Sequence, residues 1–217
     1  MKKGLFILLI FCFSLTVISC GDLKEESTTT DTTAPVIAEV TAVTTPTNDS
    51  TPDYTFSSDE AGTITYGGSC SSSTSIVISG NNTITLNSLS DGTYSDCTIA
   101  IRSSTGYLSN ILTITSFIVD STAATLTEVT AVTTTNDNTP NYIFSSSEAG
   151  TITYGGSCSS STTSVTTGSN TITLVSLSEG TYSDCTITVT DTSSNSVTLN
   201  ISSFVIDTTA PTIAEVT

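Results

Sequence analysis

The chain has 217 residues, a formal net charge of −16 at pH 7, and neither histidine nor tryptophan. Its four Lys and Arg residues are too few for the clustered cations that binding to nucleic acid requires. The absence of histidine excludes Ser-His-Asp and Cys-His catalytic arrangements. Thr, Val, Ile and Tyr are frequent after residue 26 and strong helix formers are scarce, which favours an all-β fold over a disordered chain.

The N-terminus begins with an apolar leader. Two lysines precede an apolar run over 5–17, which has the length of a signal peptide and is short for a membrane-spanning helix. The run ends in the sequence VISC at Cys20, which resembles the bacterial lipoprotein box. The resemblance implies a signal peptide at 1–19 that is cleaved before Cys20, and a lipid on the Cys20 thiol. The alternative is an ordinary secretory signal with an incidental cysteine.

A polar stretch without periodicity follows the leader. We expect residues 20–30 to comprise the lipidated cysteine and a flexible tether, at most roughly 35 Å long. Several acyl chains together would hold the protein stably on a membrane. Because Gly21 and not an acidic residue follows Cys20, the resemblance implies a lipid-anchored protein of the cell envelope, at the outer membrane or cell surface.

The rest of the chain repeats itself. The sequence TITYGGSCSSSTS at 63–75 recurs nearly intact as TITYGGSCSSSTT at 151–163. The opening sequence DTTAP at 31–35 returns in related form at 120–124 and at 207–211. These starts divide the chain into a first repeat (31–119), a second repeat (120–206) and the beginning of a truncated third repeat (207–217). We therefore expect further repeats of this kind if the chain is a fragment of a longer array.

Each repeat reads as about seven short strands separated by turns. Apolar residues alternate with polar ones at the period-two spacing of strands with one buried face. In the first repeat the expected strands cover 37–43, 52–56, 63–66, 82–86, 93–101 and 112–119. So many short strands in under ninety residues is typical of a β-sandwich.

Short motifs in both repeats resemble those of bacterial immunoglobulin-like repeats. They are the DTTAP opener, the Glu-Ala-Gly turn at 60–62 and the LxDGTY sequence at 89–94. The resemblance implies tandem immunoglobulin-like β-sandwich domains, with Tyr94 and Tyr182 as tyrosine corners. The second cysteine of each repeat follows its tyrosine by three residues instead of two, so we expect a bulge near residues 95–96.

Apart from Cys12 in the leader and Cys20 at the lipid site, the chain has four cysteines, and four cysteines allow three pairings. Each repeat holds two of them, 27 residues apart, so the repeat predicts one bridge within each. The predicted disulfides are Cys70–Cys97 and Cys158–Cys185. They imply an oxidising compartment, in agreement with export. Zinc would need four clustered ligands, which two cysteines without histidine do not provide.

Acidic residues recur at the starts of the repeats and in their turns. Calcium prefers several carboxylate and carbonyl oxygens, so a calcium site at the domain junctions is one interpretation. The candidate ligands are Asp31, Asp120, Asp207, Glu60 and Glu148. The alternative is that each aspartate caps the turn into the first strand and that no metal binds.

Near-identical neighbouring domains suit a mechanical array better than two specialised sites. We expect a non-enzymatic surface lipoprotein whose immunoglobulin-like repeats act as a stalk or adhesin-type structural array. The alternative is a binding module that recognises a glycan or a host or matrix protein through loops at one end of the sandwich, with residues 67–73 as the candidate loop.

Overall fold

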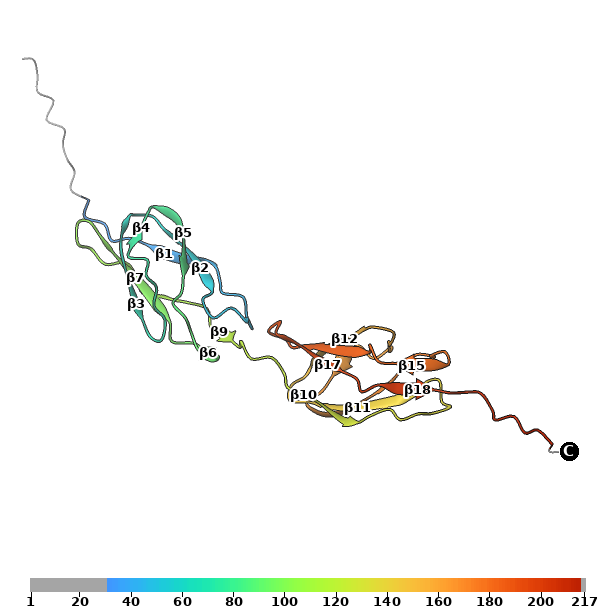
Figure 1. Cartoon of the computed structure of the whole chain (residues 1–217). Coiled ribbons are helices and arrows are strands. Elements are labelled where there is room, and N and C mark those ends of the chain that lie inside the picture. Colours follow the sequence, from blue (N-terminus) through green and yellow to red (C-terminus); the bar gives the residue numbers. More distant parts are fainter. Residues whose placement is uncertain (1–30, 216–217) are drawn as a thin grey trace, which may run out of the picture. The chain divides into compact units, whose positions relative to one another are not determined.

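The computed structural model describes residues 31–215 (Figure 1). The predicted signal peptide, Cys20 and the tether therefore lie outside the described residues, as do residues 216–217. Every regular element between residues 31 and 215 is a β-strand. The described part of the chain thus has no helix that could cross a membrane, and the all-β prediction is confirmed.

The first repeat is an antiparallel sandwich of a three-stranded and a four-stranded sheet, with a separate strand pair (Figure 1). The three-stranded sheet has the order β1 (Ile37–Thr41), β2 (Asp53–Ser58), β5 (Gly80–Thr85). The four-stranded sheet has the order β4 (Ile76–Val77), β3 (Gly62–Gly67), β7 (Thr98–Ser103), β8 (Leu112–Thr113). The pair consists of β6 (Gly92–Tyr94) and β9 (Phe117–Val119).

The second repeat has the same topology. Its three-stranded sheet has the order β10 (Leu126–Thr130), β11 (Asn141–Ser146), β14 (Gly168–Thr173). Its four-stranded sheet has the order β13 (Ser164–Val165), β12 (Gly150–Gly155), β16 (Thr186–Thr190), β17 (Ser196–Asn200). The remaining pair is β15 (Gly180–Tyr182) with β18 (Phe204–Ile206). The recurrence of one topology confirms the tandem sandwich fold.

The structure has nine strands per repeat and not about seven, because two predicted strands are each divided and the short strand β4 was not predicted. The strand expected over 93–101 is interrupted at residues 95–97, and the strand expected over 112–119 is interrupted before Phe117. The reason is a change of partner: β6 pairs with β9, whereas β7 pairs with β3 and β8. The expected bulge near residues 95–96 is thus a full break between two strands.

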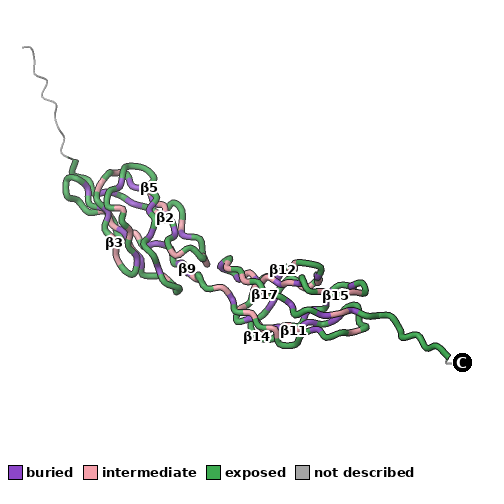
Figure 2. The backbone as a smooth tube through the Cα atoms, in the orientation of Figure 1, coloured by how far each residue is buried: buried purple, intermediate pink, exposed green. Residues whose placement is uncertain are grey.

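Each repeat has its own hydrophobic core between its sheets (Figure 2). In β2 the period-two pattern places Tyr54 and Phe56 fully inside, and both rings stack in parallel with 6.2 Å between centroids. Tyr142 and Phe144 repeat this arrangement in β11. The strand expected over 52–56 is therefore present, and its alternate aromatic residues share one buried face.

Both disulfides join neighbouring strands of one sheet. Cys70 follows β3 and Cys97 precedes β7, and these strands are hydrogen-bonded neighbours. The Cα atoms of Cys70 and Cys97 are 5.2 Å apart, as are those of Cys158 and Cys185. The bridges differ in this from the antibody disulfide, which connects the two sheets of its sandwich.

The tyrosine corners are present. The Tyr94 hydroxyl donates to the carbonyl of Ser90 at 2.8 Å, and the Tyr182 hydroxyl donates to the carbonyl of Ser178 at 2.8 Å. Each bond ties the β6 or β15 strand to the chain four residues before the tyrosine. The Tyr94 ring also stacks on Phe117 of β9, with 5.3 Å between centroids, and so supports the strand pair.

A carboxylate on the first strand of each repeat accepts hydrogen bonds from the segment that precedes the last strand. Glu39 of β1 accepts hydrogen bonds from the backbone and the hydroxyl of Thr115, at 3.0 and 2.6 Å. Burial raises the pKa of Glu39, but the Thr115 bonds outweigh burial and leave the pKa below its ordinary value. Glu128 and Ser202 form the same contact in the second repeat. The first strand is thereby held against the opposite sheet.

Candidate functional site

Three carboxylates converge at one end of the second repeat. Asp120 directly follows β9, Glu148 lies in the turn between β11 and β12, and Asp191 directly follows β16. One carboxylate oxygen of each lies within 4.8 Å of the other two. In the part of the chain that the structure describes, this is the one group of three acidic, histidine or cysteine side chains so close together.

Hydrogen bonds fix two of these carboxylates in place. Asp191 is 8% exposed, and its Oδ1 accepts from the backbone amides of Ser193 and Asn195 at 2.8 and 2.9 Å. Asp120 Oδ2 accepts from the Ser193 hydroxyl at 2.9 Å. The side-chain amide of Asn195 donates both to the Asp120 backbone carbonyl and to Asp191 Oδ2. The tight loop after β16 thus preorganises this pair.

The third carboxylate, that of Glu148, lies close to two other negatively charged carboxylates. Burial raises the pKa of Glu148, and repulsion from Asp120 and then from Asp191 raises it further. The one cationic side chain within residues 31–215 is Arg102, which belongs to the first repeat. No described ammonium or guanidinium of the second repeat therefore balances the cluster.

A cluster of three carboxylates is best suited to bind a divalent cation. Calcium takes six to eight oxygen ligands, so three carboxylates would supply part of its shell, with carbonyl oxygens and water for the rest. The Ser193 hydroxyl beside the cluster has no histidine to act as its base, because histidine is absent from the chain. Cation binding is therefore the property to test here.

The structure separates the five predicted calcium ligands. It brings Asp120 and Glu148 together, but Glu60 accepts a hydrogen bond from Thr33 at 3.0 Å, and Asp207 Oδ1 accepts from the backbone of Thr209 at 3.1 Å. Asp31 is described but is not part of the cluster. Whether calcium binds to any of these residues stays a prediction.

Sequence analysis missed Asp191. Its position in the first repeat is Ser103, as the hydrogen bonds Ser103 N to Tyr107 O and Asp191 N to Asn195 O show. Only acids that recur in both repeats were selected as ligands. The available signal was an aspartate directly after an alternating strand, in the loop sequence DTSSN.

Two other recurring acids accept hydrogen bonds from the segment that follows the last strand of each repeat. Asp91 accepts hydrogen bonds from Ser121 and Thr122, just after the last strand of the first repeat. These bonds, with that from Thr122 the strongest, lower the pKa of Asp91. Glu179 accepts from Thr208 and Thr209 in the equivalent place. These contacts give a structural role to the acid at the third position of the LxDGTY motif.

The loop proposed for ligand recognition is exposed but tied to its surroundings. Ser72 donates to the carbonyl of Thr85 at 2.6 Å, and Ser69 donates to Asp96 at 2.9 Å. Cys70 within the loop is buried in its disulfide. The segment 67–73 is therefore a fixed surface feature with polar side chains.

No family matches the chain, and no curated protein matches its sequence. Similar solved structures include the D00-D0 domain of intimin, at 14% identity over 79% of this chain and 99% of that chain, with a TM-score of 0.37. A tetra-tandem repeat in the extending region of a large adhesion protein is 20% identical over 81% of this chain and 49% of that chain, with a TM-score of 0.28.

A third similar structure is the Bacteroides ovatus mixed-linkage glucan utilization locus protein SGBP-B in complex with a mixed-linkage heptasaccharide. It is 14% identical over 79% of this chain and 45% of that chain, with a TM-score of 0.22. Likeness at this level does not transfer a ligand from one protein to another. The partner has to be sought from the surface of this chain.

Proposed function

We propose that this chain is a non-enzymatic surface lipoprotein, anchored through Cys20, whose immunoglobulin-like repeats act as a stalk or adhesin-type array. The observation that carries the proposal is the repetition of structural detail between the two sandwiches. The Tyr66 hydroxyl donates to Thr74 O at 2.8 Å, and the Tyr154 hydroxyl donates to Thr162 O at the same distance. Because the same hydrogen bonds recur in both repeats, we favour a mechanical role for the array over two different active sites.

The anchor is tested by mass spectrometry of the protein from membranes. We expect a diacylglyceryl-cysteine at the N-terminus of the mature chain, and we expect Cys20→Ser to abolish membrane retention. Protease treatment of intact cells then reports whether the repeats face outward. An unmodified Cys20 in a released protein would refute the anchor.

The alternative is that the loops bind a glycan or a host or matrix protein. Arrays of glycans and matrix proteins probed with the purified chain distinguish the two functions. Reproducible binding that is lost when the exposed Ser71 and Ser73 of this loop are replaced by alanine would favour recognition over a plain stalk.

A calcium site is a second candidate property, favoured by the Asp120, Glu148 and Asp191 cluster. Calorimetry of the full chain with calcium should show saturable binding, and the melting temperature should rise because the ion binds the folded state. Asp191→Asn should abolish both effects, whereas Asp207→Asn, outside the cluster, should not. No heat and no shift in the unaltered chain would end this interpretation.

A further inference from the structure

Exposed apolar side chains gather at one end of the first repeat. Six large ones, each at least 43% exposed, lie there: Val36, Ile76, Ile78, Tyr107, Leu108 and Ile111. We call this set, together with Arg102, the entry-end surface. Burying apolar surface is favourable by about 25 cal/mol per Å², so exposed aliphatic groups in such number require an explanation.

Hydrogen bonds place these residues beside the point where the chain enters the sandwich (Figure 1). The Val36 amide donates to Asp59 Oδ1 at 2.7 Å, and the Asn110 side chain bonds both the amide and the carbonyl of Ile37 at 3.0 Å. The Ser79 hydroxyl donates to the Asp59 carbonyl at 2.8 Å. The turn after β2, the turn after β4 and the loop after β7 therefore meet at this end.

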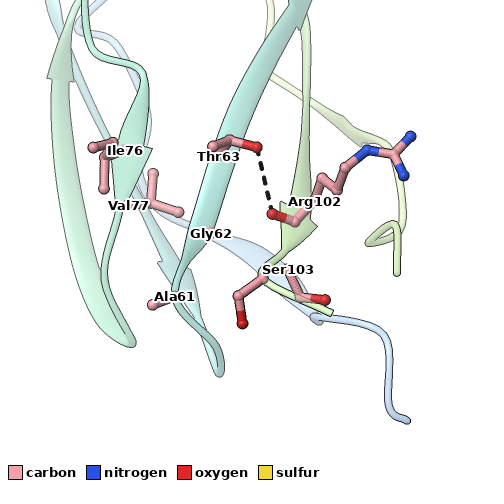
Figure 3. A pocket seen from close by; sticks show the side chains of 8 residues that line it. Ala61, Gly62, Thr63, Ile76, Val77, Arg102 and Ser103 are labelled. Atoms are coloured by element: carbon pink, nitrogen blue, oxygen red, sulfur yellow. Dashed lines mark hydrogen bonds between the residues drawn. The ribbon is translucent and has the colours of Figure 1, made fainter. Parts of the chain in front are cut away.

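The apolar residues continue across the outer face of the four-stranded sheet. Ile76 is opposite Thr63, Thr63 is opposite Arg102, and Arg102 forms a bridge with Leu108. A pocket of about 300 Å³ lies at this row and is lined by Ile76 and Val77 among others. Figure 3 shows these two side chains on one side of β3, whereas the Arg102 guanidinium extends away from them. Its Nη1 donates to the Gly106 carbonyl at 2.8 Å.

The second repeat shows that the fold does not require these residues. Matching hydrogen bonds and strand pairs place a small polar residue at each of the six equivalent positions and at that of Arg102. These residues are Thr125, Ser164, Thr166, Asn195, Ser196, Thr198 and Thr190. There the hydroxyls of Thr188 and Thr198, and of Thr190 and Ser196, bond one another at 2.8 Å. The apolar surface is therefore specific to the first repeat.

We propose that the entry-end surface docks on the membrane surface, with its aliphatic side chains at the acyl boundary and Arg102 at a lipid phosphate. This inference rests on the proposed lipid anchor at Cys20. Ten residues separate Cys20 from Asp31, so the entry end stays within roughly 35 Å of the anchored lipid. A tyrosine beside aliphatic and cationic side chains is the composition found where proteins meet lipid headgroups.

Charge favours the bilayer over a second copy of the chain. Face-to-face packing of two copies would oppose Arg102 to Arg102 and would bring together two strongly acidic chains. The acids at this end, Asp59 and Glu60, already accept hydrogen bonds from Val36 and Thr33 of the entering segment. The Arg102 guanidinium retains donors beyond its bond to Gly106, and a phosphate can accept them.

The chain contains no tryptophan, so a single introduced tryptophan reports on its own surroundings. Ile111→Trp is the reporter, and Thr198→Trp, at the equivalent position of the second repeat, is the matched control. Both are made in the full chain, purified with its lipid and reconstituted into vesicles of phosphatidylcholine and phosphatidylglycerol. We expect a blue-shifted emission and quenching by lipids brominated on their acyl chains for Ile111→Trp, and neither for the control.

Equal emission and equal quenching of the two reporters would overturn docking while leaving the anchor intact. A blue shift without vesicles that grows with protein concentration would also overturn it, because that result indicates packing between copies. Mass spectrometry of the same sample determines separately whether Cys20 carries a lipid. If Cys20 carries no lipid, the reporter is read with excess vesicles added to the free chain, so that docking is still measured.

Leu108→Ser and Ile76→Ser, made in the Ile111→Trp background without the lipid, should each weaken vesicle binding by roughly tenfold if the side chain is fully buried in the docked state. Val40→Ser, at an exposed apolar position that the second repeat retains as Val129, should leave vesicle binding unchanged. Equal effects of all three substitutions would argue against a defined docking surface.

Discussion

Replacing Cys70 and Cys97 together by alanine should strongly destabilise the first repeat. The bridge closes a loop of 27 residues that contains β4, β5 and β6. In the chain-entropy account, a loop of that length contributes about 3.5 kcal/mol by restricting the unfolded chain. For a domain of this size, such a loss lowers the melting temperature by roughly 15–25 °C. Few aromatic residues fill the core, so no other single feature replaces the bridge.

Chemical denaturation followed by circular dichroism measures this loss. The matched variant Cys158→Ala/Cys185→Ala should lose a similar amount, because its loop has the same length. Reduced unaltered protein keeps both sulfurs in the core and separates the crosslink from the cavity that alanine leaves. A loss below about 1 kcal/mol on reduction would refute the entropic reasoning.

Three further substitutions test local features by thermal denaturation. Gly68 has a φ of 72° and an added Cβ would meet the Asp96 carbonyl, so Gly68→Ala should cost about 1–3 kcal/mol; a neutral result would contradict this geometry. Tyr94→Phe removes the corner hydroxyl and should cost about 1 kcal/mol, with no cost if water replaces that bond equally well. Glu39 has a lowered pKa, so its contribution is present above pH 4.5 and is lost as the pH falls below it. Glu39→Gln should therefore flatten the acid limb of the stability profile, and an unchanged limb would exclude that role.

The division of predicted strands shows where periodicity stops being informative. Alternation marks residues 93–101 as one strand, and the buried positions Cys97, Ile99 and Ile101 agree with it. The pairing partners of Tyr94 and Thr98 belong to different sheets, however. A period of two records which side chains are buried but not which strand lies alongside, so the break at 95–97 required the tertiary structure.

The candidate cation cluster, likewise, could be predicted from the sequence only in part. Asp120 and Glu148 were selectable because they recur with the repeat, whereas Asp191 stands where the first repeat has Ser103. Its approach to Asp120 depends on the loop after β16, which folds back through the Asn195 amide. Contacts between residues 73 to 75 apart are set by packing, and local sequence does not encode them.

The sequence by itself determined that the chain repeats, its all-β class and the pairing of the cysteines. It could do so because these follow from composition, alternation and the presence of two cysteines in each repeat. Only the tertiary structure decided that each disulfide joins neighbouring strands, that three acids meet in the second repeat, and that six apolar side chains share the entry end of the first. These depend on distances between segments far apart in the chain, which the packing of the two sheets fixes.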